Sequence, residues 1–442
     1  MKKFILSIIL GTSLLFAQNF DYSGSLTTLA GAGLPYTEDN AGKILAGQLA
    51  FDNLFKAYLN ETIFYLNAVL VADGCQSQSS NGISSFVSDD GVFALKLKEA
   101  YFDYNGGVWA LRAGRQITGW GKADGIQITD ILCPQDESNM IAQTYKESRL
   151  GIDALRLSFM GDWIQSDFYW IPIFTPSTLP LAKKSPLRSL IFPSSYEGYE
   201  LNNPTRQSDF SLPDLKLYNS EYAARVGMYF SKFDLSFYGF YGWDDLPFTS
   251  YNISESGKVN VNGEYKRMAM LGADAAIPAG DFVFRLESAF FPQRNIQTSA
   301  SYQAARQLAE KAFDSSKKCE QLVSLLGFDW TPSGGWMLTF QYITDCIFND
   351  SADLDRKKFQ HQLSLTVEKG FFNENLNCSA LAFLDLRDFS STAEMSCEYN
   401  LSDAVKLGLV ANLYFKGADG KNGLYGMYKD LSCLTLKGKV SF

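Results

Sequence analysis

Apolar and polar residues alternate along most of the chain with the period of two that a β-strand requires. The clearest example is the pair of runs at 92–104 and 108–117. In the first run Lys96 and Lys98 share one parity. The opposite parity holds Phe93, Leu95, Leu97 and Tyr101. Between the runs, Asn105-Gly106-Gly107 supplies the positive φ angles of a tight turn, so this stretch predicts a β-hairpin with one apolar face.

The same pattern recurs along the rest of the chain and predicts about 18 strands. Their approximate ranges are 20–30, 43–54, 58–72, 92–104, 108–117, 149–160, 163–173, 221–230, 233–243, 264–277, 281–292, 319–330, 335–346, 357–368, 376–387, 391–400, 404–415 and 429–442. Short and long connections alternate, and both termini fall at the short-turn end. Short periplasmic turns and longer extracellular loops are typical of outer-membrane barrels. We therefore predict an all-β fold, a closed antiparallel transmembrane β-barrel of about 18 strands (range 16–20), as one domain over 18–442.

A soluble β-sandwich also has alternating strands, so the alternation alone does not decide between the two. The chain contains 14% aromatic residues, which fits the aromatic girdles at the edges of a membrane barrel. In the last strand Lys437 and Lys439 alternate with apolar residues, and the chain ends with Phe442. After the N-terminus there is no apolar run of the roughly 18 residues that a transmembrane helix needs. These features favour the barrel.

The first residues, MKKFILSIILGTSLLFAQ, have the pattern of a bacterial secretory signal. A basic start at Lys2 and Lys3 precedes an apolar stretch, and we predict cleavage after Ala17, so that 1–17 is a signal peptide. Removing the two lysines changes the formal charge from −9 to −11. An acidic chain of this kind argues against a nucleic-acid partner.

The seven cysteines and the single histidine limit the chemistry that the chain supports. No C-x-x-C pattern occurs, and one histidine cannot form a His-cluster metal site, so we expect neither a metal nor a cofactor. Cys75 and Cys133 fall in neighbouring long loops and are candidates for a disulfide. No serine lies at position 359 or 363, beside His361 on its face of the strand, so a barrel hydrolase is not expected.

Two sets of residues resemble a group of large porin-like outer-membrane proteins. The first is the segment Lys98-Glu99-Ala100-Tyr101, Gly114-Arg115-Gln116, Trp120-Gly121, Ile128-Thr129-Asp130, Pro134-Gln135-Asp136 and Arg149. The second is the terminal LTLKGKVSF, which is similar to the C-terminal signature that the outer-membrane assembly machinery is thought to read. The resemblance implies an outer-membrane channel without naming its solute.

Three loops differ from simple connections. The 118–148 loop combines glycine, aspartate and isoleucine, and we expect it to fold inward as a constriction rather than to form an outward cap. The 174–219 loop is rich in proline, which excludes regular sheet pairing, and carries a basic cluster at Lys183, Lys184 and Arg188. Residues 301–313 have the composition of a helix within a loop.

A barrel of this size encloses water, and charged groups along its wall select solutes by charge and size. Candidates for lining the pore or the constriction are Lys96, Lys98, Arg112, Arg115, Gln116, Trp120, Asp124, Asp130, Asp136, Arg149, Arg225, Arg285, Glu287, Lys437 and Lys439. We expect Asp124, Asp130 and Asp136 to pair with cations such as Arg115 or Arg149. The predicted function is passive or weakly selective diffusion of small solutes across the outer membrane. The alternative is a non-conducting surface barrel that acts as an adhesin or a structural protein.

Overall fold

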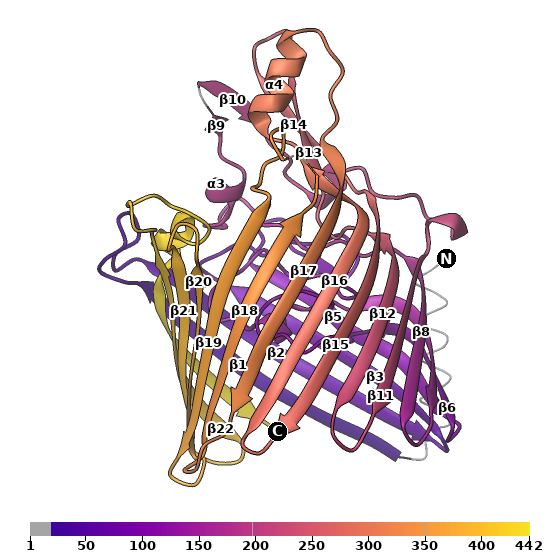
Figure 1. Cartoon of the computed structure of the whole chain (residues 1–442). Coiled ribbons are helices and arrows are strands. Elements are labelled where there is room, and N and C mark those ends of the chain that lie inside the picture. The colour runs from indigo at the N-terminus through magenta and orange to yellow at the C-terminus, as the bar shows by residue number, and fades with distance from the viewer. Residues whose placement is uncertain (1–18, 197, 350) are drawn as a thin grey trace.

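The chain forms a closed barrel of 18 antiparallel strands, as predicted. The structure is a computed structural model that describes residues 19–442 except 197 and 350, so the predicted signal peptide lies outside the described residues. Closure is made by β1 (Asn19–Gly33), which pairs with β2 (Ile44–Leu59) on one side and with β23 (Cys433–Ser441) on the other. Figure 1 shows strongly tilted strands, with short turns at one end and long loops at the other.

The other barrel strands agree closely with the predicted ranges. They are β3 (Thr62–Asp73), β5 (Phe93–Asn105), β6 (Trp109–Gln116), β7 (Ile152–Met160), β8 (Ile164–Ile173), β11 (Glu221–Tyr229), β12 (Asp234–Trp243), β15 (Arg267–Ala279), β16 (Phe282–Gln297), β17 (Ser316–Trp330), β18 (Trp336–Ile347), β19 (Phe359–Phe371), β20 (Leu376–Asp385), β21 (Ser391–Asn400) and β22 (Val405–Phe415). A short additional strand, β4 (Ser85–Val87), extends the sheet along β5.

Two local predictions are wrong. The first turn was expected at 55–57, but β2 continues to Leu59 and turns at Asn60, which adopts a φ of 49°. The second concerns β5, where a bulge leaves Lys98 without a partner, since Asn67 pairs with Glu99 and Ala68 with Leu97. A bulge adds one residue to the strand, so beyond it the positions that would face outward face inward instead. Tyr101 therefore turns inward and stacks under the Arg112 guanidinium at 4.3 Å, instead of facing outward.

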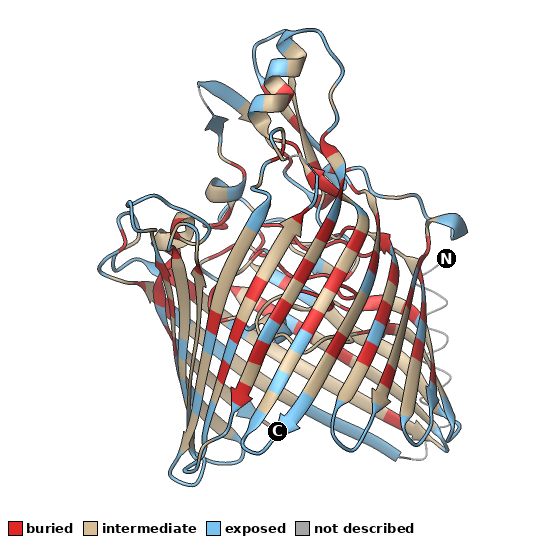
Figure 2. Cartoon of the chain, in the orientation of Figure 1, coloured by how far each residue is buried: buried red, intermediate tan, exposed pale blue. Residues whose placement is uncertain are grey.

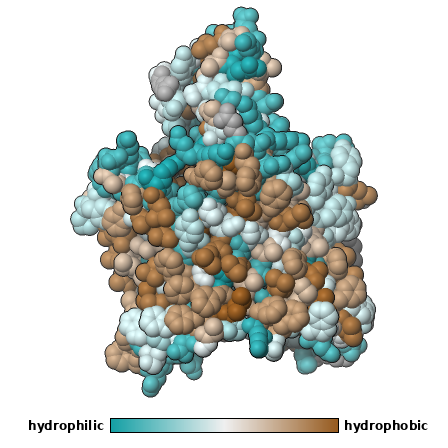
Figure 3. Space-filling model, in the orientation of Figure 1, coloured by the Kyte–Doolittle hydropathy of each residue, from teal (hydrophilic) through white to brown (hydrophobic). Residues whose placement is uncertain are grey.

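The outer surface of the barrel is apolar and the inner surface is polar. Leu271 and Leu436 are each 63% exposed on the outside, whereas Gln341 and Thr435 on inward positions are fully buried. Figure 2 shows buried and exposed residues alternating along the strands, and Figure 3 shows apolar residues gathered on the barrel wall below a hydrophilic top. Only a closed barrel satisfies every backbone hydrogen bond of strands in lipid. This architecture places the protein in the outer membrane.

A small cap stands above the long-loop end (Figure 1). Its sheet contains β9 (Ser195–Tyr196), β10 (Tyr199–Asn202), β13 (Phe248–Ile253) and β14 (Val259–Glu264). The sequence pattern did not predict these strands. Although prolines exclude sheet pairing along most of the 174–219 loop, β9 and β10 occupy the proline-free stretch between Pro193 and Pro204. The cap also carries the short helix α3 (Arg188–Ile191).

Helix α4 (Ala300–Leu308) covers the free edge of β13. The side-chain oxygens of Gln297, Gln303 and Gln307 accept hydrogen bonds from the backbone N–H groups of Thr249, Tyr251 and Ile253, at 2.8, 2.9 and 2.6 Å. These glutamines replace the partner strand that this edge lacks. The predicted helix at 301–313 is therefore present but shorter, because the chain leaves the helix after Leu308 and Glu310 adopts a φ of 54°.

All seven cysteines are free thiols in the structure, so the predicted Cys75–Cys133 disulfide is wrong. Cys133 is buried in the core of the 118–148 loop, and its sulfur accepts a hydrogen bond from Thr118 N at 3.3 Å. Cys75 instead lies against Gly47 of β2. Over 19–442, apart from the two positions left out, no helix is long and apolar enough to cross a membrane.

Candidate functional site

The 118–148 loop, called the inner loop below, lies inside the barrel. Trp120, Ile128, Ile131 and Leu132 are buried against inward-facing residues of the wall from β7 to β18. Trp120 packs on Tyr238 of β12, with ring centroids 5.0 Å apart. Burying each such side chain contributes about 1.5–3 kcal/mol. The loop therefore fills one half of the lumen with a hydrophobic core.

Glu287 of β16 fixes the tip of the inner loop. Its Oε2 accepts hydrogen bonds from Lys122 N at 2.6 Å and Ala123 N at 2.8 Å. Its Oε1 accepts from Thr129 N at 2.8 Å and Thr129 Oγ1 at 2.7 Å. Gly121, with a φ of 78°, lies so close that a Cβ there would collide with Oε1. One carboxylate thus binds the chain on both sides of the tip, at Lys122 and Ala123 before it and at Thr129 after it.

The tip also reaches two other parts of the wall. Arg285 Nη1 donates to Lys122 O at 2.8 Å and lies 3.8 Å from Asp124 Oδ2. Four strands further around the barrel, Gly125 packs next to Leu381 and Phe383 of β20. The tip therefore bridges the inner faces of β16 and β20 inside the lumen.

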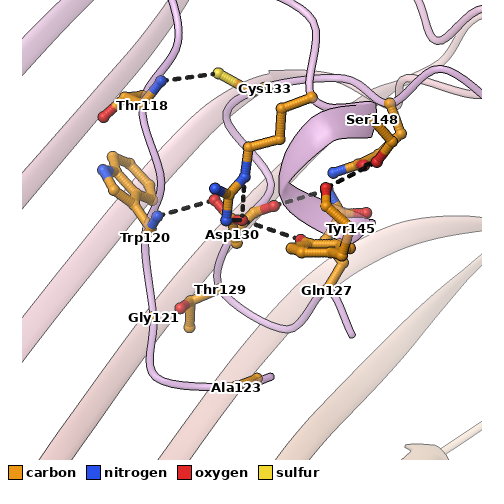
Figure 4. A network of polar contacts seen from close by, with 12 residues as sticks. Thr118, Trp120, Gly121, Ala123, Gln127, Thr129, Asp130, Cys133, Tyr145 and Ser148 are labelled. Carbon is orange, nitrogen blue, oxygen red and sulfur yellow. Dashed lines mark hydrogen bonds and ion pairs between the residues drawn. The ribbon is translucent and has the colours of Figure 1, made fainter. Parts of the chain in front are cut away.

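Asp130 organises the base of the inner loop (Figure 4). Its carboxylate accepts hydrogen bonds from Trp120 N at 2.8 Å and Tyr145 Oη at 3.0 Å, and it forms an ion pair with Arg149. Tyr145 belongs to α2 (Tyr145–Ser148), which is capped by Thr144. Because Asp130 is buried, losing its cationic partner would leave an uncompensated charge.

The other half of the lumen holds a cavity of about 330 Å³, called the pore cavity. It lies between the inner loop and the wall formed by β1, β2, β3, β5 and β21 to β23. Its charged lining residues are Asp52, Lys96, Lys98, Asp136, Glu147, Arg149, Glu398, Lys406, Lys437 and Lys439. Among the described residues, Lys98 and Lys439 form no ion pair within 4 Å, which gives the wall a basic surplus.

A second cavity of about 580 Å³, the inner mouth cavity, opens at the short-turn end beside Asp403 and Phe442. It shares Ser25, Asp52 and Lys439 with the pore cavity. The two spaces therefore meet at one cross-section of the wall. Together they form a polar passage from the inner loop to the short-turn end of the barrel.

Two loop carboxylates on the pore cavity have lowered pKa values. Burial opposes ionisation of Asp136, but Lys96, at 3.0 Å, and Ser138 lower the pKa of Asp136 below its ordinary value of 3.8. Burial likewise opposes ionisation of Glu147, yet Lys437, at 3.3 Å, helps to lower the pKa of Glu147 below 4.5. Both carboxylates are therefore ionised at neutral pH, so they neutralise these two wall lysines.

The predicted site residues fall into three groups in the structure. Lys96, Lys98, Asp136, Arg149, Lys437 and Lys439 line the pore cavity. Trp120, Asp124, Asp130, Arg285 and Glu287 belong to the inner loop or hold it. Arg112, Arg115, Gln116 and Arg225 lie on the wall without lining that cavity.

The wall residues that do not line the pore cavity form ion pairs with neighbouring residues or are buried. Arg115 pairs with Asp153 at 2.6 Å rather than with a loop aspartate, and Gln116 is fully buried. Arg225 approaches Asp167 at 3.9 Å. Arg112 pairs with Asp103, which the bulge in β5 turns inward.

Four charged residues of the pore cavity are absent from the predicted set: Asp52, Glu147, Glu398 and Lys406. Lys406 pairs with Glu398 of the neighbouring strand at 2.7 Å. The alternation of polar and apolar residues in the predicted strand 404–415 indicates that Lys406 faces inward. Asp52 shares its parity with Gln48 in the predicted strand 43–54, opposite Leu49 and Phe51, and this alternation was the signal for its inward position.

Several solved structures have the same fold. OccAB1 of Acinetobacter baumannii matches with a TM-score of 0.54 and 10% identity, over 97% of each chain. OccAB4 of the same organism matches with a TM-score of 0.52 and 8% identity, over 96% of this chain and 98% of that one. OccK9 (OpdG) of Pseudomonas aeruginosa matches with a TM-score of 0.50 and 8% identity, over 97% of this chain and 98% of that one. No family model and no curated protein matches the sequence. At these identities the likeness shows the fold, a porin-like barrel.

Proposed function

We propose that the protein is a porin-like channel for passive diffusion of small polar solutes, with a weak preference for anions. The observation that carries the proposal is the polar passage formed by the pore cavity and the inner mouth cavity. A closed barrel with a polar, partly open lumen conducts small solutes, and the charges on its wall bias which ions enter.

The proposed preference for anions rests on the ion pairs in the pore cavity. Asp136, Glu147 and Glu398 neutralise Lys96, Lys437 and Lys406, respectively. Among the described lining residues of the pore cavity, Lys98 and Lys439 form no ion pair, and Asp52, the one lining carboxylate outside these pairs, accepts a hydrogen bond from Asn67 at 2.6 Å. Asp403 lies farther along the passage, at the inner mouth cavity. The net field in the pore cavity is therefore positive but small, because most of its charges are paired.

The test is the reversal potential of the refolded protein in a planar bilayer under a KCl gradient. We expect a conducting channel with a mild chloride preference. The double substitution Lys98→Glu and Lys439→Glu should reverse this preference to potassium. Lys232→Glu, in a short turn outside the passage, is the matched control and should change nothing.

Absence of conductance in correctly folded protein would contradict the channel and favour the non-conducting barrel. An unchanged reversal potential in the double variant would contradict the role of the two lysines while leaving the channel in place.

A further inference from the structure

A cavity of about 910 Å³, called the outer cavity, lies within the cap and the long loops. Four segments contribute most of its wall: the inner loop, the 174–219 loop, the β13–β14 hairpin and α4. Its apolar lining includes Leu179, Ile191, Phe192, Tyr251, Val261 and Leu308. Small-molecule sites commonly have about 300–1,000 Å³ and a mainly apolar lining of this kind.

Part of this apolar lining is open to solvent. Leu308 is 74% exposed, Leu246 46% and Ile191 41%. These residues lie in the cap, above the apolar band of the barrel wall, so membrane lipid does not cover them (Figures 1 and 3). Concave apolar surface that stays exposed in a folded protein commonly marks a binding site.

The charged groups of the outer cavity are all acidic. Glu137 and Asp355 line it, and no described lysine, arginine or histidine does. Neither carboxylate forms an ion pair among the described residues. Desolvation by the surrounding loops and the neighbouring Asp136 raise the pKa of Glu137, and desolvation also raises the pKa of Asp355. A cationic group near them would relieve this cost, whereas an anionic group would increase it.

The basic cluster that the sequence shows in the 174–219 loop does not offset these acids. Lys183 and Lys184 do not line the outer cavity. Arg188 is held by the backbone, because its guanidinium donates to the carbonyl oxygens of Leu181 and Pro204. The cavity therefore combines an apolar body with a negative field.

The outer cavity and the pore cavity lie on opposite sides of one segment. Asp136 and Asn139 line the pore cavity, whereas Glu137 and Met140 line the outer cavity. The start of the 174–219 loop, which pairs with this segment at Asp136 and Thr178, has the same arrangement: Thr178 lines the pore cavity and Leu179 lines the outer cavity. The two spaces therefore have separate linings and opposite surplus charges.

We propose that the outer cavity is a binding site for small amphipathic organic cations, molecules with an aromatic or aliphatic body and a protonated amine. The body packs on the apolar residues of the cap, and the ammonium lies beside one of the two carboxylates, Glu137 or Asp355. The site is independent of the channel function, because its lining does not include the residues assigned to ion preference.

Two probes with the same aromatic body and opposite charge test this proposal: 1-naphthylmethylamine, which is protonated at neutral pH, and 1-naphthalenesulfonate. Binding of each to the refolded full-length barrel in zwitterionic micelles is measured by isothermal titration calorimetry. We expect the amine to bind and the sulfonate to bind more weakly. The double substitution Glu137→Gln and Asp355→Asn should weaken amine binding about two- to fivefold, the upper part of the range for one solvent-accessible ion pair, without weakening sulfonate binding.

A pair of adjacent alanines on α4 provides the steric control. Ala304 lines the cavity, whereas Ala305 is exposed and does not. Ala304→Trp should abolish amine binding, and Ala305→Trp should leave it unchanged. Equal affinity for the two probes, no affinity for the amine, or equal amine binding by the two tryptophan variants would each overturn the proposal. The conductance of every variant is measured in parallel, so that a failed channel is distinguished from a failed site.

Discussion

The anchoring of the inner loop by Glu287 leads to the sharpest prediction, for the substitution Glu287→Gln. The carboxylate accepts four hydrogen bonds, two at each oxygen. An amide keeps one acceptor oxygen for Thr129. Its NH2 group then faces the N–H groups of Lys122 and Ala123, which are themselves donors, so two bonds are lost.

The size of the effect follows from these two bonds. A hydrogen bond to a charged group contributes about 1.5–3 kcal/mol, so the tip loses about 3–6 kcal/mol of anchoring. That loss raises the population of a released tip about 10²- to 10⁴-fold. The base of the loop stays docked, because Trp120, Ile128 and Leu132 remain buried against the wall.

Single-channel recording in planar bilayers measures the consequence. We expect a higher mean conductance and larger open-channel noise for Glu287→Gln than for the unsubstituted protein. Glu394→Gln is the matched control, because Glu394 is an inward carboxylate that accepts a bond from Asn412 at 3.0 Å and, among the described residues, forms no hydrogen bond or ion pair with the tip. Migration of unheated samples on gels verifies that both variants fold. If both variants have the conductance and noise of the unsubstituted protein, the carboxylate does not restrain the tip.

Three further predictions concern the loop, its charges and the thiols. Replacing Arg149 with Met leaves Asp130 buried and unpaired, which should destabilise the docked inner loop by about 3–5 kcal/mol and increase protease cleavage within 118–148; an unchanged cleavage rate would contradict this. Because the pKa values of Asp136 and Glu147 are lowered below 3.8 and 4.5, their ion pairs persist at and above those values and are lost only as the pH falls further, so these pairs should leave the chloride preference unchanged down to pH 4.5 and raise it only at lower pH; a chloride preference that already rises between about pH 6 and pH 5 would argue against these pairs. Cys378 and Cys397 face each other across β20 and β21 with sulfurs 2.7 Å apart, and a membrane-permeant copper–phenanthroline oxidant should join them, as detected by mass spectrometry of alkylated peptides; full alkylation of both after treatment would refute the pairing.

The barrel was predictable because lipid imposes the same requirement on every strand. Outward residues must be apolar and inward ones meet water, so the alternation in the sequence directly encodes the two faces. That is why strands such as β19 and β23 lie close to their predicted ranges. The inward position of Tyr101 in β5 was not predicted, because the bulge at Lys98 that causes it cannot be recognised from the pattern of apolar and polar residues.

The arrangement inside the lumen was less predictable. The composition of the inner loop indicated an inward fold, but its partners depend on which strands meet across the barrel. Glu287 and Lys122 are far apart in the sequence, as are Arg285 and Asp124, and only closure of the sheet brings the loop tip to β16. The same holds for Arg115, whose partner Asp153 lies on the adjacent strand rather than in the loop.

The glutamine contacts along β13 have a consequence for neighbouring molecules. Surface barrels are crowded side by side in a membrane, and an open strand edge in one invites hydrogen bonding with another. Here the side chains of Gln297, Gln303 and Gln307 already accept hydrogen bonds from the backbone N–H groups along the edge of β13. Adjacent copies can therefore touch at their tops without merging into a shared sheet, which keeps the long-loop end of each one separate.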